Sequence, residues 1–141
     1  MAYIKVWVHF VWTTKNRQVF LSKKVKSKVI AHIKENALTK DIYIDSIDGG
    51  KDHLHALISL GAKQSVSELA QLLKGEASFW INKEKLVKGK FEWQDKYFAV
   101  SVSESILPTV RKYIRNQEEH HRVKPFFEEY DAFIKKYGFS E

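Results

Sequence analysis

Two histidines separated by one residue, His53 and His55, are the pair of side chains best suited to chemistry in this sequence. Side chains on a β-strand alternate between two faces, so in a strand both imidazoles point the same way, about 7 Å apart along it. The alternate positions form a wholly apolar face: Leu54, Ala56, Ile58 and Leu60. We therefore expect this apolar face to be buried and the histidines to look outward, where both could bind one ion. Two polar residues on a half-exposed strand would give the same pattern, so a third ligand is needed.

A tyrosine and an amide four residues apart, Tyr113 and Gln117, lie in a stretch whose helical pattern begins near Pro108. Residues four apart are neighbours on one face of a helix. The amide oxygen of Gln117 can bind a hard cation, so with two imidazoles it makes a three-point site with open positions for water or a phosphate oxygen. Tyrosine has an ordinary pKa of about 10 and is a weak nucleophile, but beside a metal-bound phosphate it becomes a good one. Taken alone, Tyr113 would be a partly buried helix tyrosine and Gln117 a surface amide. Taken together with His53 and His55, they indicate a catalytic metal site.

The chain contains no cysteine, which excludes a disulfide framework and a thiolate metal site. An oxygen ligand favours Mg²⁺ or Mn²⁺, although the two imidazoles would also accept Zn²⁺ or Co²⁺. The lack of cysteine also indicates a cytoplasmic protein. The apolar run at the N-terminus is too short to span a membrane and has no cleavage site.

The length of 141 residues, of which 44% are hydrophobic and 13% aromatic, predicts one globular domain over residues 1–141. Lysine and arginine exceed aspartate and glutamate by 24 to 17, a net charge of +7. The excess is concentrated in the first 40 residues, where Glu35 is the only acidic residue. A basic half of this kind suits nucleic acid, and the alternative is a helix whose lysines are merely solvated.

Hydrophobic periodicity and turn signals predict the order β-α-β-β-α-β followed by two helices. The expected elements are a strand over 3–13 in the middle of the sheet, a helix capped by Ser22 and running to about Leu38 with its lysines outward, a strand over 41–48, a turn at Gly49-Gly50, the histidine strand, a helix over 65–81, a loop over 83–96, a strand over 97–103, a helix from Pro108 to about His121, and a C-terminal helix over 126–137.

This order is that of a ferredoxin-like, split β-α-β antiparallel sheet of the α+β class. In such a fold the first and third strands are central and the helices cover one face. We expect the face that carries His53 and His55 to stay open to a substrate. His9 on the first strand could share that face, although a histidine packed between Trp7 and Val11 is the more common arrangement.

His53-Leu54-His55 and the stretch Tyr113-Ile114-Arg115-Asn116-Gln117 resemble the HUH single-stranded-DNA endonucleases, specifically the single-tyrosine transposases of the IS200/IS605 kind. Supporting similarity covers nearly the whole chain: Val11-Trp12-Thr13-Thr14-Lys15-Asn16-Arg17, Lys74-Gly75, Trp93-Gln94, Tyr97-Phe98-Ala99 and His120-His121.

The resemblance implies that His53 and His55 are metal ligands, that Gln117 is the third ligand, and that Tyr113 is the nucleophile. Some relatives that act on repeated palindromes place an asparagine three residues after the tyrosine. Asn116 is therefore the alternative third ligand, and we prefer Gln117 because its side chain reaches further.

The same resemblance implies a transposase that binds hairpins at element ends and cleaves and rejoins single-stranded DNA through a 5′-phosphotyrosine. It further implies a homodimer whose active sites are shared between subunits. The alternatives are a non-mobile relative that processes repeated palindromes, a single-stranded nucleic-acid-binding module without catalysis, and a metal-dependent hydrolase of small phosphoesters. Five further side chains could assist: Lys15 and Lys74 on phosphates, Trp93 and Tyr97 on unpaired bases, and His120 in proton transfer.

Overall fold

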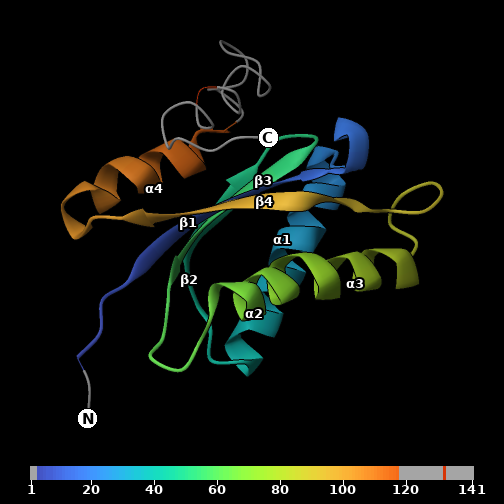
Figure 1. Ribbon diagram of the computed structural model, residues 1–141. Helices are drawn as coiled ribbons and strands as arrows, with labels where there is room; N and C mark the ends of the chain where they lie inside the picture. The colour runs from blue at the N-terminus through green and yellow to red at the C-terminus, as the bar shows by residue number, and fades with distance from the viewer. Residues whose placement is uncertain (1–2, 118–131, 133–141) are drawn as a thin grey trace.

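A four-stranded antiparallel sheet lies at the centre of the protein in the computed structural model, which describes residues 3–117 and 132 (Figure 1). The strands lie in the order β2-β3-β1-β4. Their bounds are β1 (Trp7–Thr14), β2 (Tyr43–Gly49), β3 (His53–Ser59) and β4 (Trp93–Val102). The first and third strands are central, which confirms the expected ferredoxin-like arrangement. Both are buried along their length apart from Ser59, so the residues they carry have little freedom.

Two helical segments cover one face of the sheet (Figure 1). The first is α1 (Lys23–Thr39), and the second is a continuous path through α2 (Val66–Ala70), η2 (Gln71–Glu76) and α3 (Ala77–Lys83). Each begins at the serine that the sequence predicts, because the hydroxyls of Ser22 and Ser65 accept hydrogen bonds from backbone N–H groups three residues later. The apolar faces of β1, β3 and these helices form the main core: Phe10, Trp12, Leu54, Ala56, Ile58, Val29, Ile33, Leu69, Leu73 and Ile81.

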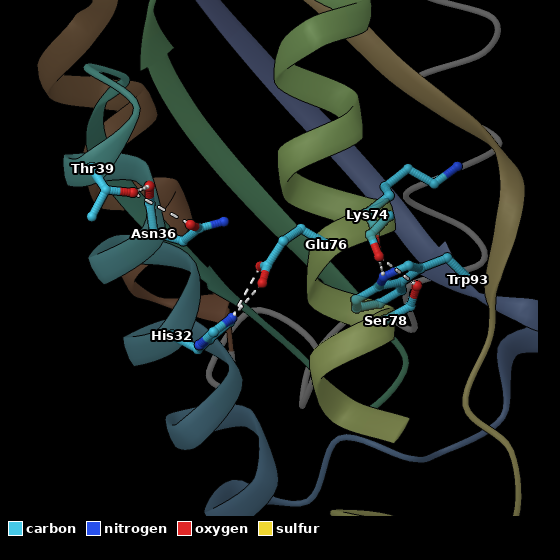
Figure 2. A network of polar contacts seen from close by, with 8 residues as sticks. His32, Asn36, Thr39, Lys74, Glu76, Ser78 and Trp93 are labelled. Carbon is cyan, nitrogen blue, oxygen red and sulfur yellow. Dashed lines mark hydrogen bonds and ion pairs between the residues drawn. The ribbon is translucent and has the colours of Figure 1, made fainter. Parts of the chain in front are cut away.

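The second helical path is not a regular α-helix, because η2 is a π-helical turn. It is tied to α1 by His32, whose Nε2 lies 3.0 Å from each carboxylate oxygen of Glu76 (Figure 2). The imidazole also stacks on Trp80, with ring centroids 4.0 Å apart. A π-helical turn inserts one extra residue per turn, a feature common at functional sites, and hydrophobic spacing alone does not reveal it.

One lysine of α1 points inward, although the sequence predicts that all of them face outward. Lys26 is buried and donates to the carbonyl of Gly49 at 2.9 Å, with Asp48 Oδ1 at 3.1 Å. A buried ammonium group needs such partners, because an isolated charge in the core is costly. The contact holds α1 against the turn that leads into the histidine strand.

The fourth strand begins at Trp93, four residues before the expected start, because Trp93 is a core residue. Its ring packs edge to face against Trp12 and Phe91, and its backbone pairs with Thr14 after a register shift. Polar residues follow within the strand and remain exposed, as an edge strand allows: Gln94, Asp95 and Lys96.

The opposite face of the sheet, which carries His53 and His55, is covered by the helix that contains Tyr113. The expectation that this face is open is therefore wrong. After the short η3 (Glu104–Ile106), α4 (Leu107–Arg115) packs over β2 and β3 on the side away from α1 (Figure 1). Leu107 and Ile114 of α4 are buried in a second apolar cluster: Trp7, Leu57, Val102, Leu107 and Ile114. The apolar side of α4 is therefore buried against this face of the sheet.

The remaining short element is η1 (Lys15–Arg17), which follows β1. His120 lies outside the described residues, as does the expected C-terminal helix over 126–137 apart from residue 132. Within the described ranges, every helix is too short or too polar to cross a membrane.

Candidate active site

His53 and His55 point to the same face of β3, as their spacing of two residues predicts, and this face lies under α4. His53 and His55 are 1% and 0% exposed, because α4 lies over them. Their rings meet edge to face with centroids 5.2 Å apart. Since β3 is hydrogen-bonded on both sides, to β1 and to β2, the pair is held on a rigid support.

His53 lies between a carboxylate and an amide. Its Nδ1 is 2.8 Å from Oδ1 of Asp52, and its Nε2 is 3.1 Å from Oε1 of Gln117. Gln117 is fully buried, and its amide nitrogen donates to the backbone carbonyl of Tyr113 at 3.0 Å. That bond orients the amide so that its oxygen faces the imidazole.

The tautomer of His53 decides the nature of this contact: with the proton on Nε2 it is a hydrogen bond to Gln117, and with the proton on Nδ1 two acceptors face each other. When Nδ1 of His53 donates its proton to Asp52, Nε2 carries a lone pair that faces the oxygen of Gln117. Two acceptors at this separation repel each other unless a proton or a cation lies at the site. A carboxylate that fixes a ligand histidine through its second nitrogen is common around metals. The donor set therefore fits a divalent cation bound by nitrogen and oxygen.

His55 is joined to a third histidine, His9 on β1. Nε2 of His9 lies 3.0 Å from Nδ1 of His55, and the two rings stack with centroids 5.2 Å apart. Burial lowers the pKa of His9 to about 4, so His9 is neutral at neutral pH and keeps one lone pair. When that lone pair accepts the Nδ1 proton of His55, Nε2 of His55 can act as a ligand. The sequence pattern favours a merely packed histidine at this position, whereas in the structure His9 contacts His55.

Tyr113 approaches the same histidines from α4. Its ring lies edge to face against His55, with centroids 5.4 Å apart, and 6.3 Å from the ring of His9. Asn116, the alternative third ligand, is exposed at the C-terminal end of α4. The structure thus brings Tyr113 and Gln117, rather than Asn116, to the two histidines.

An ion pair fixes α4 to the edge of the sheet. Nε and Nη2 of Arg111 donate to the two carboxylate oxygens of Asp45 on β2, at 2.8 and 2.9 Å. Burial raises the pKa of Asp45, but hydrogen bonds from Arg111 and Ser46 outweigh it and leave the pKa below its ordinary value. Bidentate pairs of this kind set orientation as well as distance. The pair therefore positions the helix that carries Tyr113.

Other candidates lie away from this site. Lys15 pairs with Glu92 at 2.9 Å, and Lys74 donates to the carbonyl of Asp95 at 2.7 Å. Trp93 is buried and cannot stack on a base, whereas Tyr97 is 37% exposed.

Two contributors escaped the sequence analysis, Asp52 and the pair formed by Asp45 and Arg111. The signal for Asp52 was its position directly before His53. The ion pair joins residues 66 positions apart and has no local signature. In the part of the chain that the structure describes, no three His, Asp or Glu side chains are grouped to hold a metal. A metal site here would therefore need the amide of Gln117.

A ferredoxin-like sheet with a tyrosine helix packed over a His-x-His strand defines the single-tyrosine transposase class. The family model described as "Transposase IS200 like" matches residues 2–117, so the chain belongs to this family of DNA-processing enzymes. Among curated relatives, the ISDra2 transposase TnpA of Deinococcus radiodurans is 26% identical over 117 residues, which cover 79% of this chain and 83% of that protein.

Two solved structures share the fold. A Deinococcus radiodurans protein described as a transposase superposes with a TM-score of 0.67 at 21% identity, over 82% of this chain and 93% of its own. A REP-associated tyrosine transposase bound to a REP hairpin gives a TM-score of 0.65 at 15% identity, over 86% of this chain and 72% of its own.

Proposed function

We propose that residues 1–141 act as one domain that cleaves and rejoins single-stranded DNA, with Tyr113 as the nucleophile. The observation that carries this proposal is the docking of α4. It places the ring of Tyr113 5.4 Å from that of His55 and the amide oxygen of Gln117 3.1 Å from Nε2 of His53. The proposed nucleophile and the proposed metal ligands thus lie close together between α4 and β3, where His53, His55 and Gln117 are buried.

The residues that would hold a divalent ion are His53, His55 and Gln117, with Asn116 as the less favoured alternative to Gln117. Mg²⁺ or Mn²⁺ suits a site with an oxygen ligand and open positions. When bound, the ion supplies charge stabilisation to a non-bridging oxygen of the scissile phosphate. Asp52 orients the imidazole of His53, because its Oδ1 lies 2.8 Å from Nδ1 of that ring. His9 orients the imidazole of His55 in the same way, because its Nε2 lies 3.0 Å from Nδ1 of His55.

The reaction is a transesterification. The phenolic oxygen of Tyr113 attacks phosphorus and loses its proton, a new O–P bond forms, and the bond from phosphorus to the 3′-oxygen breaks. The leaving 3′-oxygen takes up a proton, and the 5′-phosphate stays on the tyrosine. The number of phosphoester bonds is unchanged, so a second 3′-hydroxyl can reverse the step and rejoin strands without ATP.

The proposed substrate is single-stranded DNA that carries a hairpin. The solved relative bound to a REP hairpin supports this substrate, as does the basic excess of the chain. Lysines on the exposed side of α1 supply positive charge that suits stem phosphates: Lys23, Lys24, Lys28 and Lys34. A mobile element and a retained host function in palindrome processing would both use this chemistry.

We also propose a homodimer in which α4 of each subunit serves the histidines of the other. Within the chain, α4 packs on its own sheet, over β2 and β3. An exchanged helix would make the same contacts on the partner, because exchange of identical elements preserves them. The short connection through η3 would set which arrangement forms.

The test is to incubate the protein with Mn²⁺ or Mg²⁺ and a labelled single strand bearing a hairpin, followed by a denaturing gel. A metal-dependent covalent protein–DNA adduct on the 5′-phosphate side supports the proposal. Cleavage without an adduct would indicate a hydrolase that uses water. Binding without cleavage, or cleavage that survives EDTA, would contradict the proposed reaction.

A further inference from the structure

A cleft of about 740 Å³ lies on the helical side of the sheet, between the η2–α3 path and the first half of β4. None of the proposed active-site residues lines it, because they lie on the other face. Its size is within the range of about 300–1,000 Å³ that is usual for small-ligand sites. The cleft is therefore a separate feature that the reaction at Tyr113 does not explain.

Two aromatic rings line this cleft while exposed to solvent. Phe79 on α3 is 67% exposed and Tyr97 on β4 is 37% exposed. The ring of Phe79 is therefore accessible to a ligand in the cleft. Tyr97 is supported from behind by Phe10, with stacked rings whose centroids are 6.1 Å apart. Both rings thus present flat apolar surface next to open space.

The π-helical turn η2 shapes the side of the cleft that faces the helices. Gly75 lines the cleft, and a Cβ added there would lie 2.4 Å from Nε2 of Gln71, so any other residue would displace that amide. The carbonyl of Lys74 accepts a 3.0 Å hydrogen bond from the indole nitrogen of Trp93, which joins η2 to β4 (Figure 2). The hydroxyl of Ser78 donates to the carbonyl of Gly75 at 3.1 Å. These bonds fix the walls in the absence of a ligand.

Positive charge lies beside the two rings. Nζ of Lys74 is 5.3 Å from the ring centroid of Tyr97 and 2.7 Å from the carbonyl oxygen of Asp95. Figure 2 shows the side chain of Lys74 extending away from Trp93. Burial lowers the pKa of Lys74, against the opposing influence of Asp95. Lys15 and Lys90 also line the cleft, and both contact Glu92 at 2.9 Å. The cleft therefore combines flat apolar surface, an amide at Gln71 and three ammonium groups, against the two carboxylates of Glu92 and Asp95.

We propose that this cleft binds one unpaired nucleotide of the DNA strand, with its base against Phe79 and Tyr97 and its phosphate near Lys74. This inference rests on the proposed DNA substrate. A paired base presents no free face to an aromatic ring, because its neighbours in the stem cover both sides, so the occupant must be unpaired. The cleft lies on the far side of the sheet from Tyr113, so this nucleotide is distinct from the one that is cleaved.

The test compares two probes of equal phosphate count: an oligodeoxythymidylate with one central 2-aminopurine, and a blunt duplex. The variant is Phe79→Ala, with Phe79→Trp as the variant that keeps stacking and Leu38→Ala as an exposed control on α1. We expect Phe79→Ala to weaken binding of the single strand about 5- to 150-fold and to reduce the quenching of 2-aminopurine. Phe79→Trp should keep the affinity, and duplex binding should not change.

Equal weakening of both probes by Phe79→Ala would show a general phosphate surface and overturn the proposal, as would no change in either. Covalent adduct formation by the wild-type protein is measured separately. If the wild type forms no adduct but Phe79→Ala still selectively weakens single-strand binding, the proposed reaction fails and the cleft assignment stands. If the adduct forms and the selective loss is absent, only the cleft assignment fails.

Discussion

Oε1 of Gln117 lies 3.1 Å from Nε2 of His53, although 64 positions separate the two residues in the chain. The contact joins the end of the tyrosine helix to the strand that carries the histidines. Because the amide nitrogen of Gln117 donates to the carbonyl of Tyr113, the orientation of the amide depends on the turn that also carries the proposed nucleophile. Movement of α4 would therefore displace the proposed third ligand and the nucleophile together.

Replacing Tyr113 by phenylalanine should abolish the covalent protein–DNA adduct and leave fold and DNA affinity unchanged. The substitution removes only the phenolic oxygen, which is the proposed nucleophile, while the ring keeps its packing against His55. The measurements are a denaturing gel with end-labelled hairpin DNA, circular dichroism, and a binding titration. An adduct of wild-type intensity in this variant would exclude Tyr113 as the nucleophile.

The choice of third ligand can be tested with Gln117→Ala and Asn116→Ala. We expect Gln117→Ala to weaken Mn²⁺ binding at least about tenfold, since it removes the buried amide oxygen that faces His53. Asn116→Ala should have little effect, because that side chain is exposed. Calorimetric titration of the protein with Mn²⁺ reads this out without DNA, and a larger loss in Asn116→Ala would reverse the assignment.

Much of the fold follows from local patterns in the sequence. Strand alternation and the capping serines Ser22 and Ser65 depend on neighbours in the chain, and both match the structure. The turn predicted at Gly49-Gly50 begins one residue later, because Gly49 still pairs with Leu54 and the N–H of Gly50 donates to the carbonyl of His53. The shared direction of His53 and His55 follows from strand parity, and the proximity of Tyr113 to Gln117 from helical spacing. Element bounds were less accurate where a core residue such as Trp93 extended a strand.

The covering of the histidine face could not be predicted in the same way. It depends on the packing of Leu107 and Ile114 against residues from three strands, and on a contact between Asp45 and Arg111. Long-range contacts of this kind produce no periodic pattern in the sequence. The contact of His9 with His55 is likewise a matter of strand register, which places His9 opposite Leu57 and beside His55 on the same face.

The ion pair between Arg111 and Asp45 should make the docking of α4 sensitive to acid. The folded-state pKa of Asp45 lies below its ordinary value of 3.8, so the pair stabilises the fold fully above about pH 4. This contribution is lost as the pH falls through the lower, folded-state pKa. Arg111→Met should lower the urea midpoint at neutral pH and remove part of the decline below pH 4.

Lys112→Met is the matched control, since Lys112 is an exposed basic residue on the same helix. It should leave the midpoint and its acid dependence near those of the wild type. If both variants give the same profile as the wild type, the ion pair does not hold α4 in solution.

The last prediction concerns which chain supplies α4. In a mixed dimer, one subunit carries Tyr113→Phe and the other carries His55→Ala. If α4 is exchanged, the intact histidines of the first subunit meet the intact tyrosine of the second, and one of two sites is complete. We then expect about half of the wild-type cleavage, because closed two-fold symmetry gives two equivalent sites. If α4 serves its own chain, each site lacks one essential group and no activity returns.

Two different affinity tags isolate the mixed dimer, and each homodimeric variant serves as a control for residual activity. Subunits that do not associate are removed by the tandem purification, because each carries only one of the two tags, and size-exclusion chromatography shows whether a dimer exists. A pure mixed dimer that stays inactive would establish that α4 acts on its own chain, with the contacts between Arg111 and Asp45 and between Gln117 and His53 that the structure shows. Recovery of activity would establish that the same contacts are made across the dimer.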